Sequence, residues 1–201
     1  METDNSQKII LHLCASEFGS DTRDYREAGY DVRAITKDIG VENYHPPKNV
    51  YGIIANPPCT MFSIARTRAA TPRNLEEGMK LVKECLRIIW EAQYEDLGNS
   101  RTLSLKFWAI ENPATGLLRN FLGKPTFEYS PPQFGDTWSK RTALWGNFNE
   151  PKRLLLANQI KKNRDVTNMI TPMSERDRQK RTDLRSIASP FFTKAFFIAN
   201  P

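Results

Sequence analysis

Residues 50–63 read VYGIIANPPCTMFS, an apolar run that ends at two prolines and leads directly into Cys59. Because proline cannot continue a central strand, the run predicts a buried strand followed by a loop. Cys59 lies in this loop. The local sequence leaves two interpretations open: a reactive thiolate, which needs partial exposure and a favourable local field, or a small, buried and inert side chain.

Three other apolar segments predict strands of the same kind: KIILHLC (8–14), YDVRAIT (30–36) and LKFWAIENP (105–113). The helical spacing of apolar residues and the terminal signals predict helices over 21–28, 71–93 and 189–199. The second of these has Thr71 as its candidate cap and Pro72 in its first turn. Strands that alternate with helices in this way predict an α/β domain with a largely parallel sheet.

Polar residues follow three of the predicted strands, in CASEFGS (14–20), NPPC (56–59) and ENP (111–113). Ligands of parallel sheets bind beyond the carboxyl ends of the strands, so we expect the three segments to form one site. Glu111 would lie there in apolar surroundings, which raise the pKa of a carboxyl and let it hold a proton. A turn or capping carboxylate is the alternative. A thiolate beside a protonated carboxyl suits addition to a heteroaromatic ring while a ring nitrogen is protonated.

The composition of the whole chain is that of an ordinary globular protein. Its 201 residues suit one domain rather than two. No tract approaches the roughly 20 apolar residues of a membrane span, and the start METDNSQKIILHL carries no secretory signal. We therefore expect a cytoplasmic protein without a membrane partner. Three widely spaced cysteines and two histidines favour neither a disulfide framework nor a metal site.

The net charge of +6 is concentrated in one stretch. Between Lys152 and Arg185, ten basic residues stand against four acidic ones, and the rest of the chain is balanced. A localised basic surplus is typical of proteins that bind a phosphate backbone, although a solvated basic helix has the same composition. The sequence therefore predicts a single domain over 1–201, with a basic insertion at 150–186.

Three segments together resemble the DNA (cytosine-5)-methyltransferase family, in particular its small phage and bacterial forms. They are NPPCTMFSIAR (56–66), AIENPATGLLRNFLGKP (109–125) and SKRTALWGNF (139–148). The resemblance covers about 8–148, and the segment 185–201 is similar to the family's last helix. It implies a Rossmann-like, S-adenosylmethionine-dependent methyltransferase fold with three αβα layers and a mostly parallel sheet.

The resemblance implies methylation of cytosine at carbon 5 in DNA. Cys59 would attack carbon 6, and Glu111 would bind and protonate ring nitrogen 3. Asn112 would support the loop geometry, and Arg141 matches the family's basic motif. The other residues that the resemblance assigns to the DNA or the target base are Pro58, Ser63, Arg66 and Lys140.

S-adenosylmethionine is the cofactor that the resemblance implies. The family has an Asp-Leu-Phe strand end and a glycine-rich turn, whereas this chain reads HLCASEFGS at 12–20 and retains one glycine there. Small side chains would still permit close backbone approach, Phe18 would cover the adenine, and an acidic residue after the second strand would hold the ribose. The residues assigned to the cofactor are Ala15, Ser16, Phe18, Gly19, Asp38, Glu42, Asn56 and Pro57.

Larger family members carry a separate target-recognition region where this chain has about 40 residues. The resemblance therefore implies relaxed sequence specificity, and single-stranded or locally opened DNA as substrate, because the base must leave the stack. Recognition by a partner protein, and RNA or free nucleotides as substrates, stay open. Two other functions also stay open: a catalytically silent DNA-binding protein, and amino-group methylation of adenine N6 or cytosine N4, whose Asn-Pro-Pro-aromatic loop differs from NPPC by one residue.

Overall fold

A computed structural model describes residues 4–16, 19–64, 66, 69, 71–94, 105–136, 138–154 and 187–201. Its first half contains β1 (Ile9–Leu13), the 3-10 helix η1 (Ser20–Thr22), α1 (Arg23–Glu27), β2 (Asp31–Ile35), β3 (Val50–Ala55) and α2 (Leu75–Tyr94). Its second half contains β4 (Phe107–Pro113), α3 (Arg119–Leu122), β5 (Phe127–Tyr129), the 3-10 helix η4 (Pro131–Gln133), β6 (Thr142–Asn147) and α5 (Pro190–Ala199). The predicted α/β class is confirmed.

The strands form one six-stranded sheet in the order β2-β1-β3-β4-β6-β5. The first four strands in this order are parallel, as the sequence predicts. β6 runs antiparallel between β4 and β5, and neither β5 nor β6 is predicted from the sequence. The sheet is therefore mixed, and its parallel part carries the three polar segments at its carboxyl edge.

The strand order reverses between β1 and β3. From β1 the chain passes to β2 on one side and then returns to β3 on the other side. In open α/β sheets the crevice outside such a reversal is the usual ligand site. The ends of β1 and β3, at Leu13 and Ala55, therefore mark where a ligand would bind.

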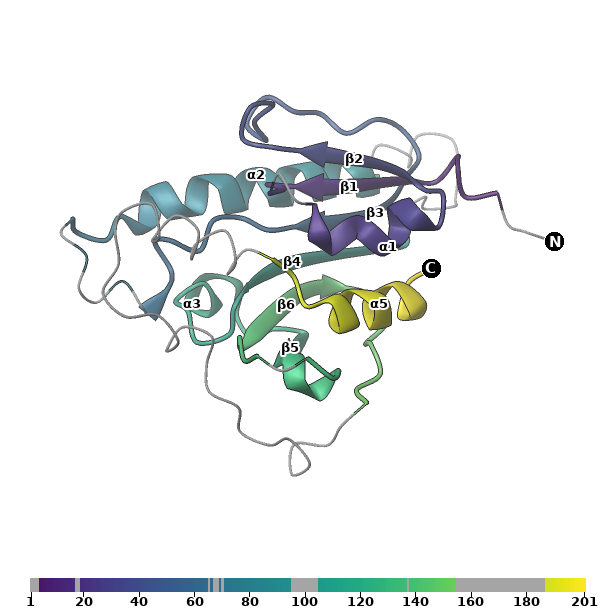
Figure 1. Cartoon of the computed structure of the whole chain (residues 1–201). Helices are drawn as coiled ribbons and strands as arrows, with labels where there is room; N and C mark the ends of the chain where they lie inside the picture. The colour runs from purple at the N-terminus through teal and green to yellow at the C-terminus, as the bar shows by residue number, and fades with distance from the viewer. Residues whose placement is uncertain are drawn as a thin grey trace.

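Helices cover both faces of the sheet (Figure 1), which gives three αβα layers. On one face, α2 packs its buried Cys85, Ile88 and Ile89 against the strands. On the other face, α1 contributes Tyr25 and α5 contributes Phe196 to a second core, which is rich in aromatic rings. The two cores hold the sheet rigidly between them, so that the loops at its edge start from well-fixed strands.

The start of α2 differs from the prediction. Thr71 does not cap the helix, which begins four residues later at Leu75. The Asn74 side chain takes that place, since its Oδ1 accepts a hydrogen bond from the backbone N–H of Glu77 (3.0 Å), a favoured capping arrangement. The Thr71 hydroxyl instead accepts a hydrogen bond from Arg66 (2.6 Å).

The last helix, α5, begins as the sequence predicts. Ser189 caps it, with its hydroxyl accepting a hydrogen bond from the N–H of Phe192 (3.1 Å), and Pro190 occupies the first helical position. The ring of Phe192 stacks on Tyr129, with ring centroids 3.7 Å apart. The C-terminal helix is thereby joined to the edge strand β5.

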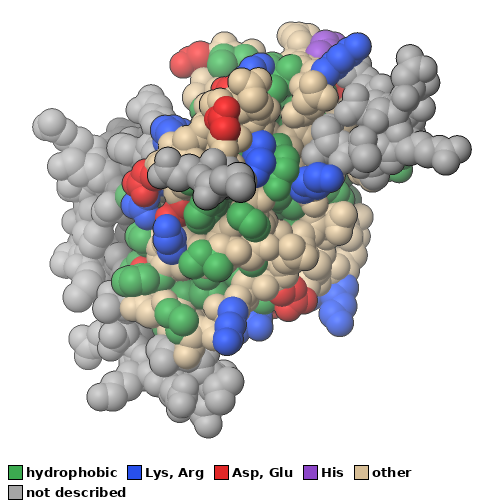
Figure 2. Space-filling view, turned by 90° about the vertical axis from the view of Figure 1, so that its right-hand side faces the viewer, with side chains coloured by type: hydrophobic (Ala, Val, Ile, Leu, Met, Phe, Trp, Pro, Cys, Tyr) green, Lys and Arg blue, Asp and Glu red, His purple; other side chains and the backbone are tan. Residues whose placement is uncertain are grey.

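Figure 2 shows the side of the molecule where the amino ends of the parallel strands lie, with acidic, basic and apolar side chains mixed on it. At these amino ends, Lys8 lies over the rings of Tyr30 and Tyr51, at 5.2 Å and 4.8 Å from their centroids. The Tyr51 hydroxyl donates a hydrogen bond to the carbonyl of Pro201 (2.5 Å). Packed aromatic rings thus close this end, and the polar segments predicted to form the site lie at the other.

Most of the predicted basic insertion, from 155 to 186, lies outside the described residues. Within the described part of the chain, no helix is both long enough and apolar enough to cross a membrane.

Candidate active site

Cys59 lies in the loop that follows β3. Pro57 is buried in this loop, whereas Pro58 and Cys59 are exposed. The carbonyl of Cys59 accepts hydrogen bonds from the N–H groups of Phe62 (2.9 Å) and Ser63 (2.8 Å), which close a tight turn. Because Phe62 is fully buried, the turn is anchored in the core while the thiol stays accessible, as a reactive cysteine requires.

Asn112, near the end of β4, ties this strand to the loop of Cys59. Its Nδ2 donates a hydrogen bond to the carbonyl oxygen of Pro57 over 2.9 Å, across 55 positions of sequence. The Asn112 side chain is fully buried. A buried hydrogen bond is costly to leave unmade, so Asn112 fixes the position of the loop relative to β4.

Glu111 forms an ion pair with Lys140, whose Nζ lies 3.3 Å from Glu111 Oε1. The carboxylate side chain is only 16% exposed. Burial raises the pKa of Glu111, the ammonium of Lys140 acts against this shift, and the carboxylate of Asp21 acts with it. Glu111 therefore holds a proton more readily than a glutamate in water.

Lys140 connects Glu111 to Cys59. Burial by itself would lower the pKa of Lys140, but the charges of Glu111, Asp21 and Cys59 raise it above its usual value. Among these charges, that of Glu111 contributes most to the increase and that of Cys59 contributes least. A cation beside a thiol favours the thiolate form, so Lys140 is suited to activate a nucleophile at position 59.

Arg141 lies differently from its neighbour. Its guanidinium pairs with Glu128 of β5, at 3.2 Å between Nη2 and Oε2, and its side chain is 61% exposed. The cation that contacts Glu111 is therefore Lys140. Arg141, which the sequence assigns to the catalytic centre, pairs with Glu128 instead. Successive residues along an extended chain point to opposite sides, which explains why only one of the two faces Glu111.

A buried histidine completes the polar cluster. His12, on β1, is fully buried, and its Nδ1 lies 3.3 Å from the hydroxyl of Thr22. Its Nε2 lies 3.9 Å from Asp21 Oδ2. Burial lowers the pKa of His12, while Asp21 and Asn56 act in the opposite direction. The imidazole is consequently held neutral near neutral pH.

A small cavity of about 20 Å³ lies between the sheet and α5, and Asp21 and Glu111 are the charged residues that line it. The rest of its lining is Ile54, Ala109, Leu144, Phe192, Thr193 and Phe196. This volume accommodates about one water molecule. A planar base is larger than this cavity.

The residues assigned to the cofactor gather at the strand reversal. Ala15 is buried and Ser16 half-buried at the end of β1. Gly19 has a left-handed backbone (φ +48°), which glycine adopts without strain. Asn56 follows β3, and its Oδ1 is buried without a hydrogen-bond partner among the described residues. Phe18 lies outside those residues.

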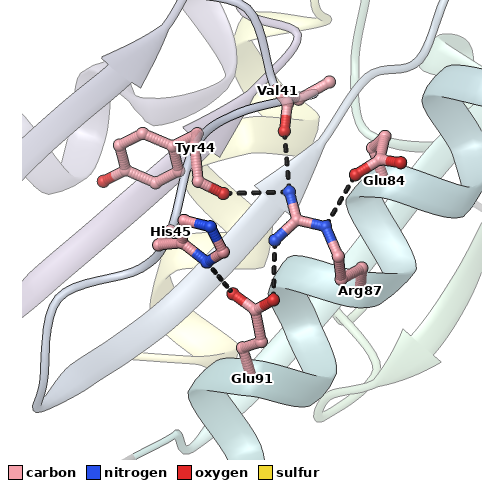
Figure 3. A network of polar contacts seen from close by, with 6 residues as sticks. All are labelled: Val41, Tyr44, His45, Glu84, Arg87 and Glu91. Atoms are coloured by element: carbon pink, nitrogen blue, oxygen red, sulfur yellow. Dashed lines mark hydrogen bonds and ion pairs between the residues drawn. The ribbon is translucent and has the colours of Figure 1, made fainter.

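Asp38 and Glu42 are exposed in the segment after β2, and α2 holds this segment in place (Figure 3). Arg87 Nη2 donates hydrogen bonds to the carbonyls of Val41 (3.0 Å) and Tyr44 (2.9 Å). The same network includes Glu84, Glu91 and His45. The two carboxylates thus lie on a segment that α2 holds in place. The charge of Glu42 acts to raise the pKa of Cys14, the residue that follows β1.

Cys14 directly follows β1 and has a left-handed backbone (φ +52°), which is uncommon for a residue with a side chain. Its Sγ lies 3.8 Å from Cys85 Sγ on α2. Cys85 itself is fully buried, on the face of α2 that packs against the sheet. Of the three cysteines, Cys59 is the exposed one.

The arginines beyond Cys59 support its loop. Arg66 donates hydrogen bonds to the hydroxyl of Thr71 (2.6 Å) and to its carbonyl (3.2 Å). Arg73 donates to the carbonyls of Met61 and Ser63, the latter over 3.2 Å. Arg66 and Ser63, both assigned to DNA from the sequence, therefore belong to a hydrogen-bonded segment that shapes the approach to Cys59.

Two residues of the cluster, His12 and Asp21, carry no functional assignment from the sequence. Asp21 lies one residue beyond the CASEFGS segment, and its position next to the predicted site is the signal that could have indicated it. His12 lies inside an apolar strand, where a polar residue marks an unusual environment. Among the described residues, no group of three or more His, Cys, Asp and Glu side chains is arranged to hold a metal ion.

Comparison with protein-family models gives no match, and comparison with curated proteins gives none either.

Proposed function

We propose that this protein methylates cytosine at carbon 5 in DNA, with S-adenosylmethionine as the methyl donor and a methyltransferase form of the α/β fold. The observation that carries the proposal is the buried hydrogen bond from Asn112 to the Pro57 carbonyl, which joins the end of β4, where Glu111 pairs with Lys140, to the loop that exposes Cys59. An accessible thiol and a largely buried carboxyl thus lie at the same carboxyl edge of the sheet. This pair suits addition to a pyrimidine ring.

Cys59 is the nucleophile in this proposal. Its sulfur forms a bond to carbon 6 of cytosine while Glu111 gives its proton to ring nitrogen 3, and the electron density moves to carbon 5. S-adenosylmethionine, when bound, supplies the electrophilic methyl group for this carbon. Carbon 5 then loses its proton to solvent, the sulfur–carbon bond breaks with its electron pair returning to sulfur, and nitrogen 3 returns its proton to Glu111.

The environment of each group supports its role. Burial raises the pKa of Glu111, so the carboxyl takes up the proton that it has to donate more readily than a glutamate in water. The ammonium of Lys140 favours the thiolate of Cys59. Asn112 holds the carbonyl of Pro57, which keeps the loop of Cys59 at a constant distance from the end of β4.

The donor site is inferred from the strand reversal and from Asn56. The Asn56 side chain interacts with His12 on β1, so the residues at the two strand ends of the reversal lie together there. Ala15, Ser16 and Gly19 leave room for close approach at the neighbouring strand end. Asp38 and Glu42 are the carboxylates that would accept hydrogen bonds from ribose hydroxyls.

DNA with an unstacked cytosine is the proposed substrate. An enzyme that acts on carbon 6 of cytosine needs the base to leave the duplex stack, and the exposed Cys59 is accessible to such a base. The basic surplus of the chain would attract the phosphate backbone. Single-stranded or locally opened DNA meets both conditions.

The proposal is tested by offering the protein S-adenosylmethionine with a deuterated methyl group, together with single-stranded or duplex DNA. The digested nucleosides are then analysed by mass spectrometry. We expect labelled 5-methyldeoxycytidine with the wild-type protein and none with Cys59→Ala. Cys85→Ala, which removes a buried thiol on α2, should still form it. Label on adenine N6 or cytosine N4 would replace the proposal by amino-group methylation, and DNA binding without label would replace it by a silent DNA-binding protein.

A further inference from the structure

Three arginines surround Glu128 on the edge strand β5. Arg119 Nη2 lies 3.4 Å from Glu128 Oε1, and Arg141 Nη2 lies 3.2 Å from Glu128 Oε2. Arg153 donates a hydrogen bond to the Glu128 carbonyl over 2.8 Å and lies over the ring of Phe127 at 4.2 Å from its centroid. Three segments of the chain thus direct guanidinium groups to one residue.

The charges of this cluster do not balance, since Arg119 and Arg141 share one carboxylate and Arg153 contacts only the backbone carbonyl of the same residue. The three arginines are exposed, with Arg119 44% and Arg141 61% accessible, while Glu128 is 31% accessible. Exposed ion pairs contribute about 0–1 kcal/mol each to stability. The three cations therefore contribute little to folding stability in this place. Binding of an anion would explain why they lie together.

The arginine cluster lies near the carboxyl end of β4, as the candidate active site does. Asn112 on β4 is paired with Ala143 on β6, and Ala143 is paired with Glu128 on β5. Residues directly opposite each other share a face of the sheet, so Asn112 and Glu128 lie two strand spacings apart, about 10 Å. In the sequence, Arg141 also directly follows Lys140, which pairs with Glu111.

We propose that Arg119, Arg141 and Arg153 bind phosphates of the DNA strand whose cytosine enters the site. The Glu128 carboxylate holds the guanidinium groups of Arg119 and Arg141 in place until the phosphates arrive, and the Glu128 carbonyl holds that of Arg153. The planar guanidinium presents paired N–H donors that match phosphate oxygens as well as carboxylate oxygens. Phosphates compete with the Glu128 carboxylate for the donors of Arg119 and Arg141. The inference rests on the proposed function only in taking DNA as the partner.

The test measures the affinity for a fluorescently labelled single-stranded oligonucleotide by anisotropy, over a series of NaCl concentrations. Removing one phosphate contact on single-stranded DNA lowers the slope of log affinity against log salt by about 0.7. We therefore expect Arg119→Gln and Arg153→Gln each to weaken binding with this change in slope. Glu128→Gln is expected to do the opposite and tighten binding, because it removes the competing carboxylate.

Arg33→Gln is the matched control. Arg33 is an exposed arginine that pairs with Asp31 at 2.7 Å on β2, the strand at the other edge of the sheet, and its loss should leave affinity and slope unchanged. Circular dichroism and thermal unfolding verify that each variant is folded. Unchanged slopes in Arg119→Gln and Arg153→Gln, or weaker binding in Glu128→Gln, would overturn the inference, as would a folded wild-type protein that does not bind the oligonucleotide.

The methyl-transfer assay separates this inference from the proposed function. Salt slopes that change as expected without any methyl transfer would support the arginine cluster and contradict the methyltransferase. Methyl transfer with unchanged slopes would support the methyltransferase and overturn the arginine cluster.

Discussion

The side-chain amide of Asn112 donates a hydrogen bond to the carbonyl oxygen of Pro57 over 2.9 Å, joining the end of β4 to the loop that presents Cys59. This single contact relates the position of Glu111, the residue before Asn112, to that of the thiol. The distance between the proposed nucleophile, Cys59, and the proposed proton donor, Glu111, therefore depends on a buried amide to which the proposal gives no chemical role.

Loss of this hydrogen bond should increase the mobility of the Cys59 loop, while the fold remains intact. Asn112→Ala leaves the Pro57 carbonyl without its partner, and we expect it to lower the free energy of unfolding by about 1–3 kcal/mol. Hydrogen exchange of the backbone amides over 59–63 should become faster, while exchange in β1 and β3 stays slow. Unchanged exchange over 59–63 in a folded variant would contradict the role assigned to Asn112.

Accessibility predicts the order in which the cysteines react. Iodoacetamide should label Cys59 first and Cys85 last, because Cys59 is exposed and Cys85 is fully buried. Lys140→Met should slow the labelling of Cys59, since it removes the cation that favours the thiolate. Peptide mapping by mass spectrometry over time gives each rate. Equal labelling rates of Cys59 in the wild-type protein and in Lys140→Met would contradict an effect of the Lys140 ammonium on the thiol.

The raised pKa of Glu111 predicts how methyl transfer depends on pH. Glu111 acts in its protonated form, so the rate should fall as the pH rises through its pKa. The charge of Lys140 lowers the pKa of Glu111, and Lys140→Met should therefore move this decline to higher pH. Lys80→Met, which removes an exposed lysine paired with Glu77 on α2, is the control that should not move it. A shift to lower pH in Lys140→Met would contradict the account.

The lowered pKa of His12 predicts an acid-sensitive fold. Burial holds the imidazole neutral in the folded protein, whereas in the unfolded chain it takes up a proton below about pH 6.5. Stability from this residue is therefore present above that pH and is lost as the pH falls further, by at most about 1.4 kcal/mol per pH unit. Urea unfolding between pH 7.5 and 5.5 measures this loss.

His12→Asn is the matching variant, because it keeps a polar atom near the position of Nδ1 and cannot take up the proton. Its free energy of unfolding should decline less over the same pH range. An equal decline in both proteins would show that another group causes the acid sensitivity.

The first four strands and the helices α2 and α5 are predictable from the sequence because each depends on its own residues. β1 and β3 are short apolar runs, and α2 has apolar residues at helical spacing over its whole length. β6 is different. Its sequence TALWGN contains glycine and follows a polar segment, and it forms a strand because β4 and β5 pair with it on both sides. Such pairing partners cannot be read from the strand itself.

In the candidate site, too, some residues are predictable from the sequence and others are not. Cys59, Glu111 and Asn112 are expected at one edge because they follow strands of a parallel sheet, and the structure places them there. The choice between Lys140 and Arg141 depends on how the chain enters β6, which the sequence does not reveal. The contribution of Asp21 depends on the turn between β1 and α1, which brings its carboxylate to Glu111.

The most direct test of the central claim uses DNA in which 5-fluorocytosine replaces the target cytosine. Fluorine at carbon 5 takes the place of the proton that has to leave, so the bond between sulfur and carbon 6 cannot break after methyl transfer. With S-adenosylmethionine present, we predict a covalent complex whose DNA-modified peptide contains Cys59, and no complex with Cys59→Ser. Methyl transfer to ordinary cytosine without such a complex, or a complex formed through Cys14 or Cys85, would contradict the account.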